Sequence, residues 1–214
     1  MGEIVLVRHG QANSAATDEA SYDKLSDLGH QQARWLGEYL HTHEEGFDLV
    51  LSGTLQRHQE TTASMGLTPT RLDERLNELD YFNLSQALET ARGIPRPDGE
   101  GFAAHIPIVM EAWHAAEIQG QESFANFEGR VSAVLAEAQQ PGKRVLCITS
   151  GGVIGMVLRH ILGLDPRRMA HILLPIYNTS LHRLAVRPEG AMLSGFNATP
   201  HLDPPERLHG RTHY

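Results

Sequence analysis

The sequence predicts a three-layer α/β/α sandwich with a mostly parallel central sheet. Short runs of branched aliphatic residues alternate along the chain with longer segments in which apolar residues recur at helical spacing. This alternation is typical of parallel strands joined by helices. The aliphatic runs also end at glycine-containing loops, where a strand of an open sheet turns sharply. Because 214 residues suit one large domain, we expect a single domain over residues 1–214.

The first part of the chain alternates strand and helix. Residues 3–8 and residues 47–51 are short aliphatic runs and predict two buried strands. Ser26 or Asp27 can begin the helix between them, because both side chains accept hydrogen bonds from the first helical turn. The apolar residues of this helix share one face: Leu28, Trp35, Leu36, Tyr39 and Leu40. A second helix is expected over residues 55–65.

The pattern loosens over residues 79–120, where glycine and proline recur. We expect a small helical cap insertion there, with one short helix before Gly93 and another over residues 106–117. The remaining pattern predicts, in order, a helix at 124–135, a strand at 144–149, a helix at 153–162 and a hairpin of strands at 181–186 and 191–196. The C-terminal tail, residues 200–214, is expected to be loosely ordered.

Composition and charge favour a small solute as the partner. The formal net charge is −8, aromatic residues make up only 6%, and no basic block stands out, which argues against nucleic acid. The N-terminus turns polar too soon for a signal peptide, and no apolar run reaches membrane-spanning length. We therefore expect no membrane partner and a cytoplasmic location. Cys147 lies in an apolar run and is the single cysteine, so it is expected to be a small buried side chain.

No metal or cofactor is expected. Although the chain has 13 histidines, only residues 41–45 form a cluster, and this cluster falls at the apparent end of a helix. Helix capping and exposed charge explain it. Paired cysteines, the His-Glu-x-x-His spacing of zinc enzymes and the glycine-rich signatures of nucleotide-binding loops are missing from the sequence. The sequence is silent on oligomeric state.

Polar residues follow three of the predicted strands: Arg8-His9-Gly10, Ser52-Gly53 and Ser150-Gly151-Gly152. Ligands of open parallel sheets bind beyond the carboxyl ends of the strands, so these three loops are expected to share one pocket. A neutral imidazole can attack phosphorus, and a guanidinium group can hold phosphoryl oxygens. An Arg-His-Gly triplet also arises by chance, so this triplet alone does not identify a phosphoryl site.

Several motifs resemble those of the histidine phosphatase (phosphoglycerate mutase-like) superfamily, in the same order over residues 3–186. They are LVRHGQ at 6–11, YDKLSDLGHQQA at 22–33, LQRHQET at 55–61, LNE at 76–78 and QESF at 121–124 followed by Arg130-Val131. Several motifs in order are far more specific than any one of them. The resemblance implies a phosphoglycerate mutase-like α/β fold and a small phosphorylated substrate, or inorganic phosphate, as the ligand.

The resemblance also implies a role for each matching residue. His9 is then the nucleophile that forms a phosphohistidine, and water hydrolyses this intermediate. Arg8 and Arg57 clamp the nonbridging oxygens, because positioning and charge stabilisation dominate phosphoryl transfer. Glu78 protonates the leaving oxygen and afterwards activates water. Glu78 lies in an acid-rich stretch, so a solvated surface charge remains the alternative interpretation.

Further substrate contacts are expected from the loops. The hydroxyl of Ser150 and the amides of Gly151 and Gly152 lead into a helix and can complete an anion site, although the glycines can equally serve as turn formers. Gln11 ends the first motif and Asn13 follows it, and both are either ligand contacts or simply polar loop residues. Together, the expected substrate-binding residues are Arg8, Arg57, Asn13, Ser150 and Gly151.

One position departs from the family pattern. Ser150 stands where the family usually has a second catalytic histidine, and serine donates a hydrogen bond without carrying a positive charge. We therefore expect reduced activity, and Ser150→His is expected to raise turnover about ten-fold if the larger side chain fits. His58 stands where alanine is usual, and it is a candidate to reach the same pocket.

A phosphomonoesterase is the leading interpretation, and three others stay open. The substitution at Ser150 suggests a phospholigand-binding protein with little turnover, since fold does not guarantee chemistry. An isomerase of the phosphoglycerate mutase type needs an intermediate that outlives hydrolysis. A serine hydrolase that uses Ser150 needs glycine two residues earlier, where Ile148 stands.

Overall fold

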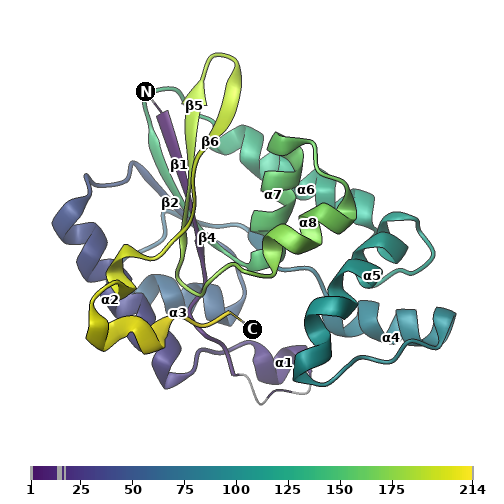
Figure 1. The fold of residues 1–214 in the computed structure, drawn as a ribbon. Helices are drawn as coiled ribbons and strands as arrows, with labels where there is room; N and C mark the ends of the chain where they lie inside the picture. The colour runs from purple at the N-terminus through teal and green to yellow at the C-terminus, as the bar shows by residue number, and fades with distance from the viewer. Residues whose placement is uncertain (1, 14–15, 17, 214) are drawn as a thin grey trace.

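The computed structural model describes residues 2–13, 16 and 18–213. Its strands form one six-stranded sheet with the order β3-β2-β4-β1-β5-β6 (Figure 1). The strands are β1 (Gly2–Arg8), β2 (Leu49–Ser52), β3 (Arg71–Leu72), β4 (Arg144–Thr149), β5 (Leu181–Arg187) and β6 (Gly190–Ala198). The first four run parallel, while β5 and β6 form an antiparallel hairpin at one edge. The sheet is therefore mostly parallel, as predicted.

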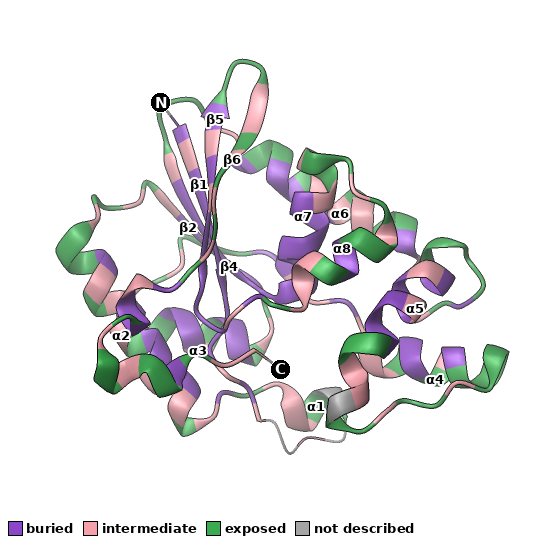
Figure 2. Ribbon diagram, in the orientation of Figure 1, coloured by how far each residue is buried: buried purple, intermediate pink, exposed green. Residues whose placement is uncertain are grey.

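Helices cover both faces of the sheet (Figure 1). The α-helices of the described residues are α1 (Glu19–Tyr22), α2 (Asp27–His43), α3 (Gln56–Ser64), α4 (Tyr81–Arg92), α5 (Phe102–His114), α6 (Phe124–Ala138), α7 (Gly151–Leu162) and α8 (Pro166–Leu173). The alternation of side chains along β1 separates two apolar cores. Val5 and Val7 belong to the core shared with α2, whereas Ile4 and Leu6 belong to the larger core shared with α5, α6 and α7. Figure 2 shows the buried residues along the strands and the inner sides of the helices.

The second helix, α2, begins where the sequence indicated. Ser26 is the N-cap residue, and its hydroxyl accepts a hydrogen bond from the backbone N–H of Gly29 at 3.0 Å. The helix ends at His43, so the histidines of residues 41–45 lie at its exposed C-terminal end. Among the described residues, no helix is long and apolar enough to cross a membrane.

Residues 79–120 form the two predicted short helices, α4 and α5. Asp80 caps α4 by accepting a hydrogen bond from the backbone N–H of Asn83, and Gly93 ends it in the left-handed conformation, at φ 66°. The helix predicted over residues 106–117 lies earlier in the chain, since α5 begins at Phe102 and ends at His114. It stops before Ala116, whose φ of 57° is not helical. Both helices lie beyond one end of the sheet in Figure 1.

The prediction of a loosely ordered tail was wrong. Two 3₁₀ helices, Pro200–Leu202 and Pro205–Gly210, bring the C-terminal chain back against α2. His201 and Leu202 are buried there, and the Gln32 side-chain amide donates to the carbonyl of Gly210 at 2.7 Å. These contacts are made with distant parts of the chain, so the local sequence pattern carries no sign of them.

Candidate active site

The carboxyl ends of the parallel strands bring the predicted polar residues together. Arg8, the last residue of β1, is paired with Thr149, the last residue of β4, so His9 and Ser150 follow side by side. The other neighbour of β4 is β2, which ends at Ser52 immediately before Gly53. The three loops therefore meet at one edge of the sheet, which agrees with the prediction from strand order.

His9 is almost fully buried, at 2% exposure, and its backbone is fixed on both sides. Its N–H donates to the carbonyl of Thr149 at 2.9 Å, and its carbonyl accepts from the side-chain amide of Asn178 at 3.1 Å. The ring Nδ1 lies 2.7 Å from the carbonyl of Gly10. Because a carbonyl only accepts, Nδ1 carries the hydrogen and Nε2 keeps its lone pair.

Electrostatics keep the His9 ring neutral. Burial lowers the pKa of His9 well below its ordinary value, and the positive charges of Arg57 and Arg8 lower this pKa further. A neutral imidazole with a free Nε2 lone pair is the form that can act as a nucleophile.

Two arginines flank His9. Arg8 is 8% exposed and donates through Nη1 to the carbonyl of Ile176, while its Nε is buried without a hydrogen-bond partner among the described residues. Arg57, near the start of α3, is fully buried, and its guanidinium lies 5.0 Å from the centre of the Tyr22 ring. Two buried guanidinium groups beside a neutral imidazole favour an anion with several oxygens.

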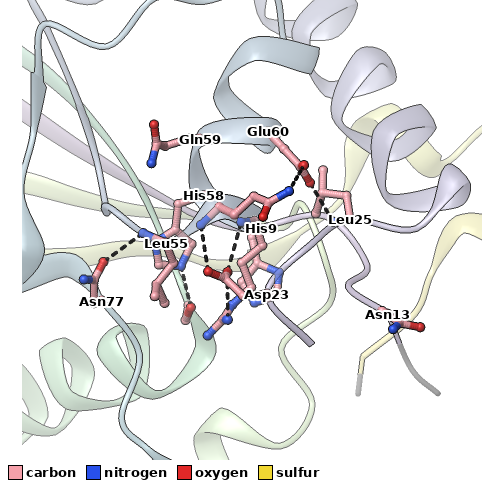
Figure 3. Close-up of polar contacts among 12 residues, drawn as sticks. His9, Asn13, Asp23, Leu25, Leu55, His58, Gln59, Glu60 and Asn77 are labelled. Carbon is pink, nitrogen blue, oxygen red and sulfur yellow. Dashed lines mark hydrogen bonds and ion pairs between the residues drawn. The ribbon is translucent and has the colours of Figure 1, made fainter. Parts of the chain in front are cut away.

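Asp23 is a site residue for which the sequence analysis gave no role. Its carboxylate accepts from the Arg57 backbone N–H and from Arg57 Nη1, both at 3.1 Å, and from the Gln56 backbone N–H at 2.9 Å (Figure 3). It therefore holds the guanidinium of Arg57 and also caps the first turn of α3. Its place in the second matched motif, with only Lys24 and Leu25 between it and the capping Ser26, was the available signal.

Glu78 points toward the same region. One carboxylate oxygen accepts from the backbone N–H of Gly152 at 3.0 Å, at the first turn of α7. The loop that carries Glu78 is held by Arg130, which donates to the carbonyl of Asn77 at 2.7 Å and pairs with Glu122 at 2.6 Å. Glu78 is thus a positioned carboxylate and not a freely solvated surface charge.

A cavity of about 530 Å³ lies over these groups, between the strand ends and helices α4 and α5. Arg8, Arg57, Glu78, Gly151 and Gly152 line its polar end. The rest of the wall is mostly aromatic or aliphatic and includes Tyr22, Leu79, Tyr81, Phe82, Phe102, Ile106, Met110, Leu173 and Leu174. The acidic neighbours of Glu78, Glu74 and Asp80, do not line this cavity.

Asn13 and Gln11 are engaged elsewhere. The side-chain amide of Asn13 donates to the carbonyl of Ser21 at 2.9 Å, and Figure 3 shows Asn13 well apart from His9. The side-chain carbonyl of Gln11 accepts from the Ser26 hydroxyl at 2.9 Å. Neither residue lines the cavity, and substrate binding by Asn13 stays a prediction. Both side chains instead hold the loop between β1 and α2.

Ser150 and His58 contact each other beneath the polar end of the cavity. Ser150 Oγ lies 2.6 Å from His58 Nε2, and both residues are fully buried. Burial lowers the pKa of His58 well below its ordinary value, and the neighbouring Arg57 charge lowers it further, so this ring is also neutral.

Neither a reactive thiol nor a metal-binding cluster is found among the described residues. Burial raises the pKa of the Cys147 thiol to about 12, so the thiol stays protonated. Within the described part of the chain, no group of three or more histidine, cysteine, aspartate or glutamate side chains is arranged to hold a metal ion.

Comparisons with known proteins identify a family model and related chains. The family model described as the histidine phosphatase superfamily (branch 1) matches residues 4–199. A broad-specificity phosphatase of Saccharomyces cerevisiae is 26% identical over 199 residues, which cover 83% of this chain and 76% of the yeast protein.

Two solved structures share the fold. A phosphoserine phosphatase mutant from Entamoeba histolytica, in complex with phosphoserine, has a TM-score of 0.69 at 21% identity, covering 94% of this chain and 100% of that chain. A mycobacterial glucosyl-3-phosphoglycerate phosphatase in complex with VO3 has a TM-score of 0.63 at 23% identity, covering 92% and 98%. The family match over most of the chain, on a sheet whose strand ends carry Arg8 and His9, shows that this protein belongs to the histidine phosphatase superfamily.

Proposed function

We propose that this protein is a phosphomonoesterase that works through a phosphohistidine on His9. The observation that carries the proposal is the buried, neutral His9 ring, which keeps the lone pair on Nε2 and is close enough to Arg8 and Arg57 for both charges to lower its pKa. The broad-specificity phosphatase similar to this chain supports the same class of reaction.

In the first step, His9 Nε2 attacks phosphorus and the bond from phosphorus to the ester oxygen breaks. Arg8 and Arg57 hold the nonbridging oxygens, whose charge they neutralise in the transition state. Protonated Glu78 gives its proton to the leaving oxygen, so that the alcohol departs neutral. The products of this step are the alcohol and the phosphohistidine.

In the second step, water attacks the phosphorus of the phosphohistidine while the Glu78 carboxylate takes one of the water protons. The bond from phosphorus to Nε2 then breaks, which restores neutral His9 and releases inorganic phosphate. The same carboxylate serves as acid and then as base, and its hydrogen bond to Gly152 keeps it in place for both steps.

The wall of the cavity indicates the substrate. With the phosphate at the polar end, the alcohol portion faces Tyr81, Phe82 and Ile106 of α4 and α5. Aromatic and aliphatic side chains lose contact with water when an apolar group covers them, so they favour an apolar partner. We therefore propose that the preferred substrates are small phosphomonoesters with an aromatic or aliphatic alcohol. We also propose that the protein acts on them in the cytoplasm.

A panel of phosphomonoesters tests this function. Phosphate release from phenyl, naphthyl and hexyl phosphate is compared with release from glycerol phosphate and phosphoserine, for the native protein and for His9→Ala. His41→Ala is the matched control, because His41 is exposed at the end of α2. We expect activity with the apolar esters that is lost in His9→Ala and retained in His41→Ala. Equal activity in His9→Ala and the native protein would overturn the proposed nucleophile.

A phospholigand-binding protein with little turnover is the second candidate, because Ser150 is not the histidine of the family pattern. The same panel separates the two functions when inorganic phosphate binding is measured by calorimetry beside turnover. Phosphate binding that needs His9 and Arg57, with no release of phosphate from any ester, favours the binding protein.

The geometry argues against a serine hydrolase. Ser150 Oγ has an imidazole partner, but His58 Nδ1 has no hydrogen-bond partner among the described residues. A catalytic triad needs an acidic group at that nitrogen to orient the imidazole.

A further inference from the structure

We propose that His58 and Ser150 act as one hydrogen-bonded unit in which the imidazole of His58 aims the hydroxyl of Ser150 at the phosphoryl group. Ser150 is then a catalytic hydrogen-bond donor and His58 a positioning residue. The inference rests on the phosphatase function proposed above, and it explains how this chain works without a histidine at position 150.

The contact itself is short and fully enclosed. His58 Nε2 and Ser150 Oγ are 2.6 Å apart, although 92 positions separate the residues in the sequence. Both side chains are completely buried, so water does not compete for the hydrogen bond. The His58 and His9 rings have centres 5.7 Å apart, which places the pair next to the proposed nucleophile.

The surroundings are shaped to admit an imidazole at position 58. A Cβ atom added to Gly53 would lie 2.0 Å from His58 Nδ1, so any side chain at position 53 would collide with the ring. The family resemblance places alanine at position 58 and histidine at position 150, and this chain has a large residue at the first and a small residue at the second. Compared with the family pattern, the imidazole stands on α3 instead of at the end of β4, and it lies against both Ser150 and His9.

The capping geometry of α7 also distinguishes Ser150. It is the N-cap residue, a position where serine usually accepts a hydrogen bond from the first helical turn. Its side chain makes no such bond here, and the backbone N–H of Gly152 donates to Glu78 instead. The Ser150 hydroxyl is therefore committed to His58 and not to the helix.

Within the part of the chain that the structure describes, His58 Nδ1 has no hydrogen-bond partner, and this indicates the direction of the hydrogen bond to Ser150. The neutral ring carries one hydrogen, either on Nδ1 or on Nε2. A hydrogen on Nδ1 would make this nitrogen a buried N–H donor without an acceptor, and such donors are rare in proteins. The hydrogen therefore lies on Nε2 and is donated to Ser150 Oγ, which leaves the hydroxyl hydrogen of Ser150 free to bond a phosphoryl oxygen.

This arrangement changes the expected effect of placing a histidine at position 150. The Ser150→His side chain would enter space that His58 now fills, so the single substitution is expected to lower activity and not to raise it about ten-fold. Removing the His58 ring at the same time makes room. The double variant H58A/S150H then has the residue sizes of the family pattern.

The test is a set of variants assayed on one good ester and in orthovanadate binding: H58A, S150A, H58A/S150A, S150H, H58A/S150H and H58Q. Loss of a preorganised donor typically costs about 10²-fold in rate, so we expect kcat to fall by roughly this factor in S150A and H58A, with KM little changed. H58A/S150A is expected to be no slower than the slower single variant. H58Q, which retains an N–H near the position of Nε2, is expected to lose less than H58A.

Rescue is the decisive result. We expect kcat of H58A/S150H to exceed that of H58A and of S150H, which a purely structural role of His58 does not predict. Additive losses in H58A/S150A, or a kcat of H58A/S150H no higher than that of H58A despite native-like melting, would overturn the inference. So would S150A with native kcat.

Vanadate binding separates failure of this inference from failure of the proposed function. If no ester is hydrolysed but the native protein binds vanadate more tightly than S150A and H58A do, the pair is supported and the phosphatase function is not. If the native protein and both variants bind vanadate equally, or none binds it, the pair does not serve a phosphoryl group.

Discussion

The carboxylate of Glu78 accepts a hydrogen bond from the backbone N–H of Gly152 over a distance of 3.0 Å. The contact joins residues 74 positions apart and places the proposed acid at the N-terminal end of α7. Gly152 leaves no room for a side chain there, because an added Cβ would lie 2.1 Å from the nearer Glu78 oxygen. The position of the proposed acid thus depends on a glycine of another loop.

Glu78→Gln is expected to lower kcat by about 10²–10⁴-fold, because glutamine keeps an acceptor for Gly152 and loses the transferable proton. The loss should be larger for alkyl phosphates than for p-nitrophenyl phosphate, whose leaving group needs no protonation. The measurement is kcat/KM across leaving groups of increasing basicity, because kcat/KM reports the first step and excludes the hydrolysis of the phosphohistidine that all esters share. Asp80→Asn is the matched control, because Asp80 caps α4 outside the cavity and asparagine also caps helices. An equal loss for all leaving groups would count against Glu78 as the acid.

Gly152→Ala is expected to displace the Glu78 carboxylate and lower kcat by about 10²-fold, which is typical of a misplacement of about 1 Å. Gly129→Ala is the control, because a Cβ at Gly129 within α6 meets no atom within 4 Å. Melting temperatures and steady-state kinetics of the two variants provide the measurement. A fully active Gly152→Ala protein would show that the contact with Gly152 is not needed.

Asp23→Ala is expected to lower kcat/KM by about 10- to 100-fold, because hydrogen bonds to charged groups contribute about 1.5–3 kcal/mol. The substitution removes the carboxylate that accepts from Arg57 Nη1, and it uncaps α3. Asp23→Asn, which can still cap the helix, separates the two effects, since it removes the charge alone. Asp203→Ala is a surface control, since Asp203 pairs with Arg211 near the C-terminus. If Asp23→Asn and Asp23→Ala melt like the native protein and keep full activity, Asp23 has no role in orienting Arg57.

Stability is expected to fall as the pH falls from about 6.5 toward 3. Burial lowers the pKa of His182 and of His201 to about 3, with smaller contributions from Arg8 and Arg207 respectively. Between about pH 6.5 and 3 the unfolded chain binds a proton at each position that the folded chain does not, so each histidine destabilises the fold by about 1.4 kcal/mol per pH unit. Above pH 6.5 neither state is protonated there, and the effect vanishes.

Urea unfolding at pH 7.5, 6.0 and 5.0 measures this dependence. His201→Gln keeps a polar partner for Thr179 but has no titrating ring, so the slope below pH 6.5 should decrease by about 1.4 kcal/mol per pH unit. His41→Gln, at an exposed position, is the control. An unchanged slope in His201→Gln would show that this ring does not contribute.

Much of the architecture was predictable because it is encoded locally. The aliphatic run of β1 and the capping serine before α2 are visible in short windows of sequence, since strand burial and helix capping act between near neighbours. The order of elements then placed Arg8 and His9 at a strand end, where a parallel sheet binds ligands.

The helix α8 and the two-residue strand β3 were missed for the complementary reason. An eight-residue helix that begins at Pro166 and a two-residue pairing at the sheet edge leave little periodicity to detect. The ordered C-terminal segment was missed because its stability comes from Gln32 and other distant partners.

The sequence by itself determined which chemical groups are present: Arg8, His9, Arg57 and Glu78, and a serine at position 150. Only the tertiary structure decided which of them meet. The sheet order inserts β4 between β2 and β1, so the loop after β4 lies beside the loop after β2 and the start of α3. Ser150 thereby meets His58, while Asn13 is turned to its own loop. Contacts across neighbouring strands depend on how the sheet is assembled, which no local pattern of residues specifies.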